Sequence, residues 1–233
     1  MVSRKELKNR AKVQLGSGIF SSRWMTALLV CLVYSAIVGL CSLPGSIDSF
    51  IQNVKNISSG ELANLNITIS YTSGIGTVLL LLIGGPLNYG KDRMFLKQAR
   101  DNEDLLFTDL FKGFTEDPGG NILISIFASL FTFLWGLLFV IPGIVKAYAY
   151  SMAYYVKADH PEYDWRMCIS ESKRLMKGNK GKLFVLDLSF IGWYFVGMLC
   201  LGVGIFWVVP YEEATKAHFY QNLLIASAAD PTN

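Results

Sequence analysis

Charged residues are scarce in this sequence. Lysine, arginine, aspartate and glutamate make up 17% of its 233 residues, whereas soluble domains carry about 25%. Residues 24–43, 71–90 and 121–145 hold no charged residue, and residues 183–211 hold one, Asp187. A run of about 20 apolar residues crosses a bilayer as a helix, because hydrocarbon offers no partner to free backbone groups. The sequence is therefore not an ordinary soluble domain and predicts an all-α, polytopic helical membrane protein.

Motifs of hydrolases, redox enzymes and metal sites are also missing. The sequence has two histidines and no HEXXH, GxSxG or CxxC motif. The four cysteines lack paired spacing, which predicts buried free thiols. GNKGK at residues 178–182 lacks the spacing of a phosphate-binding loop. We therefore expect no metal, no cofactor and no catalytic residue, and a membrane enzyme is only the third function considered.

Basic residues gather in two segments. Residues 1–23 hold six against one acid, residues 157–182 hold seven against four, and residues 44–70 hold only Lys55. Lysine and arginine are enriched in cytoplasmic loops. We therefore expect an outer loop at 44–70, cytoplasmic segments at 1–23, 91–120 and 158–182, and a plasma-membrane location with both termini cytoplasmic. The first apolar run is long enough to be an uncleaved anchor. The basic residues expected at the membrane surface are Arg4, Lys5, Lys8, Lys12, Lys177, Lys180 and Lys182.

Six membrane helices follow from this pattern, in one domain of residues 1–233. Pro142 and Pro210 each end an apolar run, and proline suits the first turn of a helix because its missing N–H is not needed there. Two Pro-turned helical hairpins are therefore predicted. The six helices are expected at 24–43, 71–90, 121–141, 143–157, 183–209 and 210–228.

Short amphipathic helices are predicted in the cytoplasmic segments. Leu7, Ala11 and Leu15 recur every fourth residue within Ser3–Leu15, on the inner membrane surface. A second such helix would use Leu106, Leu110 and Phe114, and a surface helix is expected over residues 164–177.

Polar residues follow both prolines and are the candidate ligand site. Ionisable groups inside membrane helices are costly and normally face a cavity or a partner. We expect Lys146 to pair with Glu212 or Glu213 and to line a polar cavity open to the outer side. Asp187 is expected at the depth of Lys157 or Tyr154. The candidate ligand-binding residues are Lys146, Tyr150, Glu212 and His218.

Interfacial anchoring is the alternative explanation of the same residues. Lysine side chains extend to the headgroups, and tyrosines gather at membrane interfaces. Glutamates at the start of a helix are stabilised by its dipole.

Several motifs together resemble one family of bacterial membrane proteins. They are RKELKNRAK, GPLNYG, FKGF, IPGIVKAYAYSMAYYVKAD, ESKRLMKGNK, LSFIGW and PYEEATKAHFY. The family, known mainly from Gram-positive bacteria, is catalogued as domain of unknown function number 975, and the resemblance covers nearly the whole chain. The chain resembles more distantly the membrane domain of some glycerophosphodiester phosphodiesterases, whose catalytic domain has no counterpart here. The resemblance implies a membrane fold and location, and the second relative points toward lipids.

The expected function is non-catalytic. We expect the protein to bind or move an amphipathic ligand, a lipid or a peptide, in envelope maintenance or protection. The alternative is a structural or regulatory subunit that docks a protein partner through its basic cytoplasmic loops. Membrane lipids are expected partners in both cases and nucleic acid in neither, and the sequence indicates no oligomeric state.

Overall fold

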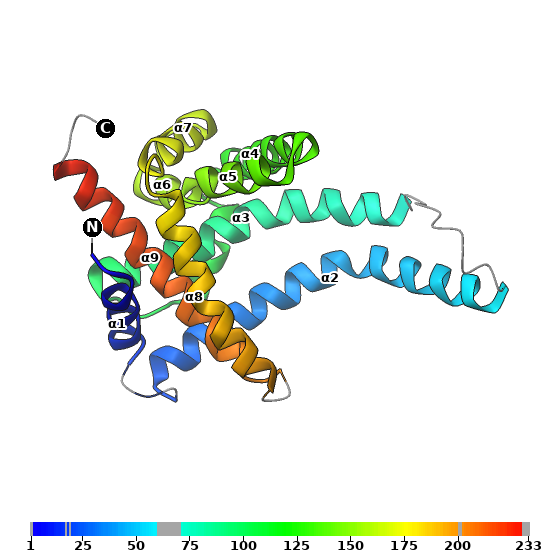
Figure 1. Ribbon diagram of the computed structural model, residues 1–233, viewed down its shortest axis with the longest axis horizontal. Helices are drawn as coiled ribbons and strands as arrows, with labels where there is room; N and C mark the ends of the chain where they lie inside the picture. The colour runs from blue at the N-terminus through cyan, green and yellow to red at the C-terminus, as the bar shows by residue number, and fades with distance from the viewer. Residues whose placement is uncertain (1, 17, 19, 60–70, 200–201, 230–233) are drawn as a thin grey trace.

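The structure is a computed structural model that describes residues 2–16, 18, 20–59, 71–199 and 202–229 (Figure 1). The predicted outer loop 44–70 is wrong over residues 44–59, which are helical and continue the first membrane helix, whereas residues 60–70, and Cys200, lie outside the described residues. Every regular element within the described ranges is helical, so the predicted all-α class is confirmed. The elements are α1 (Arg4–Leu15), α2 (Ser22–Ser59), α3 (Tyr71–Asp101), the 3₁₀-helix η1 (Phe107–Phe114), α4 (Pro118–Leu138), α5 (Val140–Tyr150), α6 (Ala153–Asp159), α7 (Trp165–Leu175), α8 (Lys180–Leu199) and α9 (Ile205–Ala229).

Six of the helices are arranged as three antiparallel pairs. They are α2 with α3, α4 with α5, and α8 with α9, and α3 also packs against η1, α4, α6 and α9. Figure 1 shows α2 and α3 extending together well beyond the ends of the other two pairs. Three segments in the described residues are long and apolar enough to cross a membrane, at Ser22–Cys41, Pro118–Leu138 and Lys180–Leu199. These segments support a membrane protein.

The turn between α4 and α5 is a single residue. Asp117 caps α4, its carboxylate accepting a hydrogen bond from the Gly120 N–H at 3.0 Å. The helix ends at Leu138, Phe139 is extended, and α5 begins at Val140, so Pro142 lies within the first turn of α5. The predicted return helix 143–157 is not continuous, because it is interrupted between Tyr150 and Ala153 and continues as α6.

The predicted helix start at Pro210 is wrong. The chain turns earlier, between Leu199 and Ile205, and Pro210 lies inside α9. Gly202 has a φ of 79°, a conformation that glycine adopts at little cost. Gly204 lies against the backbone of Gly197, so the two helices meet where neither has a side chain. Glycines rather than the proline therefore form this turn.

The amphipathic pattern of α1 is confirmed, but its partner differs from the predicted one. Leu7, Ala11 and Leu15 are buried, with exposed fractions of 3%, 0% and 0%. They face the protein, because α1 packs against α9 and also touches α2 and α3. The apolar face of α1 therefore belongs to the protein core and does not lie on the inner membrane surface.

The predicted face of η1 is wrong in two of its three residues. Leu110 is fully buried, whereas Leu106 and Phe114 are 60% and 40% exposed. A 3₁₀-helix has three residues per turn, so Leu110 shares its inner side with Gly113 rather than with Phe114. Four-residue spacing therefore does not describe this segment.

The cysteines in the described residues are free thiols, as the spacing predicts. Cys31 and Cys168 are buried and Cys41 is half-buried. Cys168 lies in α7, whose N-cap Asp164 accepts a hydrogen bond from the Met167 N–H at 2.8 Å. Burial raises the pKa of the Cys168 thiol to about 11, which makes it a weak nucleophile at neutral pH.

Candidate functional site

The predicted pairing of Lys146 with Glu212 or Glu213 is wrong. The Lys146 ammonium lies 4.7 Å from the ring centre of Trp135, at the end of α4. Glu213 instead accepts a hydrogen bond from Lys91 of α3 at 2.8 Å. Glu212 accepts one from Lys216 at 2.6 Å. The physical reason is that α3 packs against α9 and brings Lys91 to the position predicted for Lys146.

Tyr150 and His218 lie in two further places. Tyr150 lines a crevice of about 550 Å³ between α3, α4 and α5. His218 lines a different cavity, of about 580 Å³, together with residues of α1, α2 and α3. The structure therefore does not bring Lys146, Tyr150, Glu212 and His218 into one site.

Asp187 and Lys157 have different hydrogen-bond partners, which leaves the predicted common depth a prediction. Asp187 accepts a hydrogen bond from the hydroxyl of Tyr148 at 3.0 Å. Lys157 contacts Asp117 at 2.6 Å and donates to the carbonyl oxygens of Pro161 and Tyr163. Asp187 therefore does not meet Lys157 or Tyr154 as its hydrogen-bond partner.

A buried ion network joins α3 to α9 near the centre of the molecule. We use this name for Lys91, Asp92, Glu212, Glu213 and Lys216. Lys91 lies 2.8 Å from Glu213 and 3.7 Å from Asp92. The side chains of these three residues are at most 15% exposed. Because Lys91 lies closer to Glu213, it compensates the charge of Asp92 less than that of Glu213.

The other half of the network is fully hydrogen-bonded. Glu212 accepts from Lys216 through one oxygen and from the hydroxyl of Tyr194 of α8 through the other. Lys8 of α1 lies near enough to Glu212 to interact with it electrostatically. Burial, followed by the neighbouring charge of Arg4, lowers the pKa of Lys8.

Lys91 and Asp92 were missed at the sequence level because residues 91–120 were assigned to the cytoplasm. The available signal was the helix itself. The sequence from the apolar run through Pro86 to Arg100 contains no glycine or proline after Gly90. The structure shows α3 continuing to Asp101, so Lys91 and Asp92 belong to the same helix as the apolar run.

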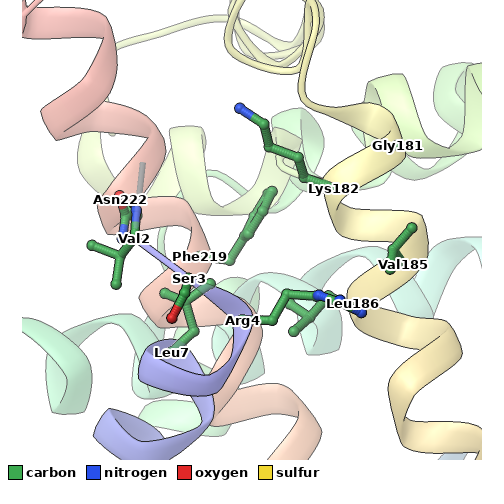
Figure 2. A pocket seen from close by; sticks show the side chains of 10 residues that line it. All are labelled: Val2, Ser3, Arg4, Leu7, Gly181, Lys182, Val185, Leu186, Phe219 and Asn222. Carbon is green, nitrogen blue, oxygen red and sulfur yellow. Dashed lines mark hydrogen bonds between the residues drawn. The ribbon is translucent and has the colours of Figure 1, made fainter.

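A second site lies between α1, α8 and α9. It is at the end of the α8–α9 pair that is away from the turn between these two helices. This α1–α8–α9 cavity has a volume of about 420 Å³. Its wall is largely apolar, and Figure 2 shows Phe219 of α9 reaching into the space between Arg4 of α1 and Lys182 of α8. The residues that line it are Val2, Ser3, Arg4, Leu7, Gly181, Lys182, Val185, Leu186, Phe219 and Asn222.

The position of α1 beside this cavity is fixed by polar contacts. The Val2 N–H donates to Asn222 at 3.3 Å. The Lys8 ammonium donates to the Ser189 carbonyl at 3.1 Å and lies 3.9 Å from the ring centre of Phe190. The hydroxyl of Tyr211 donates to the Lys8 carbonyl. Residues distant in sequence thus form a common wall.

Positive charge is concentrated at the cavity. Arg4 forms no ion pair within the part of the chain that the structure describes. Lys182 donates to the side-chain oxygen of Asn179 at 2.9 Å and lines the cavity beside Arg4. Both residues were predicted as membrane-surface basic residues. An apolar wall with two cations suits a ligand that has an anionic group and a hydrocarbon part.

The helical fold and the three apolar segments support one class, the all-helical membrane proteins. Within that class, residues 137–227 match the family described as "Protein of unknown function (DUF975)", so the chain resembles this family from the end of α4 to α9. The curated proteins gave no match to the chain, and neither did the solved structures. The likeness to the membrane domain of glycerophosphodiester phosphodiesterases stays a prediction.

Proposed function

We propose that the protein binds an anionic amphipathic molecule, such as an acidic membrane lipid, in the α1–α8–α9 cavity. The carrying observation is the combination in one cavity of apolar Leu7, Leu186 and Phe219 with the cations of Arg4 and Lys182. An acidic headgroup would lie between the two cations. Its hydrocarbon part would contact the apolar wall, so that neither the charges nor the apolar surface need water.

The position of the cavity along α8 supports a membrane ligand. Gly181 and Lys182 lie at the start of α8, which is one of the three apolar segments. Val185 and Leu188, further along α8, expose 36% and 50% of their surface and offer a path for a chain too long for 420 Å³. Anionic lipids of a cytoplasmic leaflet attract lysine and arginine by about 1 kcal/mol each. The proposed ligand therefore enters from the inner leaflet.

The proposal includes a topology in the plasma membrane. Six crossings are formed by α2, α3, α4, α5 together with α6, α8 and α9, with both termini cytoplasmic. The connection of α4 to α5 supports this, since Leu137, Phe139 and Ile141 are each at least 70% exposed and need an apolar solvent. The basic segments 1–23 and 157–182 lie at the opposite ends of these helices.

A protein partner is the second candidate function. Its supporting observation is the exposed basic surface of the segment from α7 to α8, which includes Arg166, Lys173 and Lys177. Met167 in the same segment is 49% exposed. An acidic protein surface would fit this face.

Native mass spectrometry of the protein released from nanodiscs tests the lipid proposal. The nanodiscs contain phosphatidylethanolamine and phosphatidylglycerol in equal parts. We expect an adduct of one phosphatidylglycerol that persists at activation energies which remove the other lipids. Arg4→Gln combined with Lys182→Gln should lose that adduct.

A matched control uses two lysines of similar exposure. Lys5→Gln combined with Lys177→Gln removes the same charge outside the cavity and should retain the adduct. Equal loss in both double variants would show that only net charge matters and would contradict a defined site. A bare protein in every case would favour the protein-partner function.

A further inference from the structure

The crevice between α3, α4 and α5 leads from the exposed surface to the buried ion network. Ser129 and Ser151 lie at its exposed end. Asp92, which is 7% exposed, lies at its buried end. Asn88 is one helical turn before Asp92, so both side chains are on the same face of α3. Asp92 is thus the one member of the network that also lines this crevice.

The walls of the crevice are rich in oxygen atoms. Ser125, Ser129 and Thr132 follow one another at helical spacing on α4. Tyr150 and Tyr154 face them from α5 and α6. Hydroxyl and amide oxygens are the groups that replace water around a small hard cation. The crevice therefore offers a polar route through surroundings that are otherwise apolar.

The charges around Asp92 do not balance. Within the buried ion network, the three carboxylates of Asp92, Glu212 and Glu213 face the two ammonium groups of Lys91 and Lys216. Asp187 lies beside Lys216, and Lys8 lies between Glu212 and Arg4 outside the network. Tyr34 of α2 and Tyr154 and Tyr155 of α6 also face Asp92, but neutral phenols add no positive charge. The group therefore carries one surplus negative charge.

In the described part of the chain, Asp92 and Asp187 are the carboxylates of this group without a cation at hydrogen-bond distance, and of the two Asp92 lines the crevice. Glu212 has Lys216 and Glu213 has Lys91 as a cationic partner within hydrogen-bond distance, whereas Asp187 has the neutral hydroxyl of Tyr148. Among the residues that the structure describes, the ionic partner of Asp92 is Lys91 at 3.7 Å, which is longer than a hydrogen bond. An uncompensated charge in a buried position is costly, so a further positive charge would stabilise this arrangement.

We propose that Asp92 binds one monovalent cation, either a proton or an alkali-metal ion, that enters through the crevice between α3, α4 and α5. A single positive charge balances the network, whereas a divalent ion would leave it positive. No cluster of three or more histidine, cysteine, aspartate or glutamate residues in the described ranges could hold a metal ion such as zinc. This site is separate from the α1–α8–α9 cavity and does not depend on ligand binding there.

Thermal unfolding of the purified protein, followed by its five tryptophans, tests this proposal. Sodium chloride is titrated against choline chloride at constant ionic strength and pH 8, and a second series varies pH in choline chloride. A bound cation stabilises the folded state, so Tm should rise with the logarithm of the cation concentration, by about 3–6 °C at ten times the Kd. A rise with sodium identifies an alkali-metal ion. A rise only on lowering the pH identifies a proton.

Asp92→Asn should remove the dependence, because the neutral amide has no charge to compensate. The matched control is Asp109→Asn, a carboxylate that is 5% exposed and paired with Lys112 outside the network. This control should keep the cation dependence of the original protein. A dependence that persists in Asp92→Asn, or an original protein insensitive to both titrations, would overturn the proposal.

A second measurement needs no variant and covers the case in which Asp92→Asn does not fold. Dicyclohexylcarbodiimide reacts with protonated carboxyl groups in apolar surroundings, and the modified residue is found by peptide mass spectrometry. We expect modification of Asp92 that slows as sodium is added or as the pH rises. Absence of modification at Asp92, or modification independent of both, would overturn the proposal equally.

Discussion

The Nζ atom of Lys157 lies 2.6 Å from Oδ2 of Asp117, the residue that caps α4. Lys157 is 2% exposed and belongs to α6. The same ammonium donates to the carbonyl oxygens of Pro161 and Tyr163 at 3.0 and 2.7 Å. One buried lysine therefore joins the start of α4, the end of α6 and the loop before α7.

Lys157→Met should destabilise the protein by about 2 kcal/mol, because two partly buried carbonyl oxygens lose their donor. Asp117 contributes less to this loss, since its side chain is 50% exposed and water can replace the lysine. Unfolding in mixed micelles of increasing dodecyl sulfate content measures the change. Lys146→Met is the control, because the contact of that ammonium within the described ranges is with the partly exposed ring of Trp135, worth about 0.5–1 kcal/mol. Equal losses in both variants would contradict the structural role of Lys157.

Stability should fall at acidic pH through Asp117. The hydrogen bond from Lys157, followed by that from the Gly120 N–H, lowers the pKa of Asp117 below its ordinary value of 3.8. The stabilisation is therefore complete above the ordinary pKa and is lost as the pH falls through the lowered one. Its size stays below about 1 kcal/mol because the carboxylate is half exposed.

Comparison with Asp117→Asn over a pH series isolates this contribution. The difference in unfolding free energy between the two proteins should be constant near neutral pH. It should shrink once the pH falls below about 4. A difference that grows on acidification would mean that the lysine does not stabilise the ionised carboxylate.

Gly113→Ala should weaken the contact between η1 and α3. A Cβ atom on Gly113 would overlap the backbone of Pro86, and backbone cannot move aside as a flexible side chain can. We expect a destabilisation of about 1–3 kcal/mol, the usual cost of overpacking. Gly119→Ala is the control, because a Cβ atom there meets nothing within 4 Å. Thermal unfolding of the two variants side by side decides the matter, and similar Tm values would show that η1 can shift without cost.

Ala11→Glu should detach α1 from the protein. Ala11 is completely buried, so a carboxylate at this position would be removed from water without a partner. Lys12→Glu introduces the same group at an exposed position and should leave α1 in place. Limited trypsin digestion reports the difference, since the N-terminal lysines and arginines become cleavable when α1 is released. Rapid cleavage of both variants, or of neither, would contradict the buried face of α1.

Much of the helical architecture could be predicted because apolar runs in lipid have few alternatives to a helix. The buried face of α1 was equally predictable, since Leu7, Ala11 and Leu15 recur at the helical period. These are local properties of the chain. The spacing of residues along one helix is sufficient to derive them.

The side-by-side order of helices was not predictable in this way. Lys146 and Glu212 follow Pro142 and Pro210 at similar distances, which suggested a common depth and hence a pair. Depth does not say which helices are neighbours, and α3 supplies Lys91 to α9 instead. The helix start predicted at Pro210 was wrong for a related reason, because the glycines before it already form the turn. Contacts between distant segments depend on how the helices pack. The periodicity of residues within each helix does not determine this packing.

The unbroken length of α2 has a mechanical consequence. Its 38 residues extend about 57 Å, against about 30 Å for the hydrocarbon layer. About one third of the way along α2 from its start, the Tyr34 hydroxyl donates to Asn88 of α3 at 2.8 Å. Asn88 lies one helical turn before Asp92. A rod of this length that pivots there by about 5° carries its far end about 3 Å sideways. A force on the distal half of α2 would therefore turn the helix about Tyr34 and act on the residues beside the buried ion network.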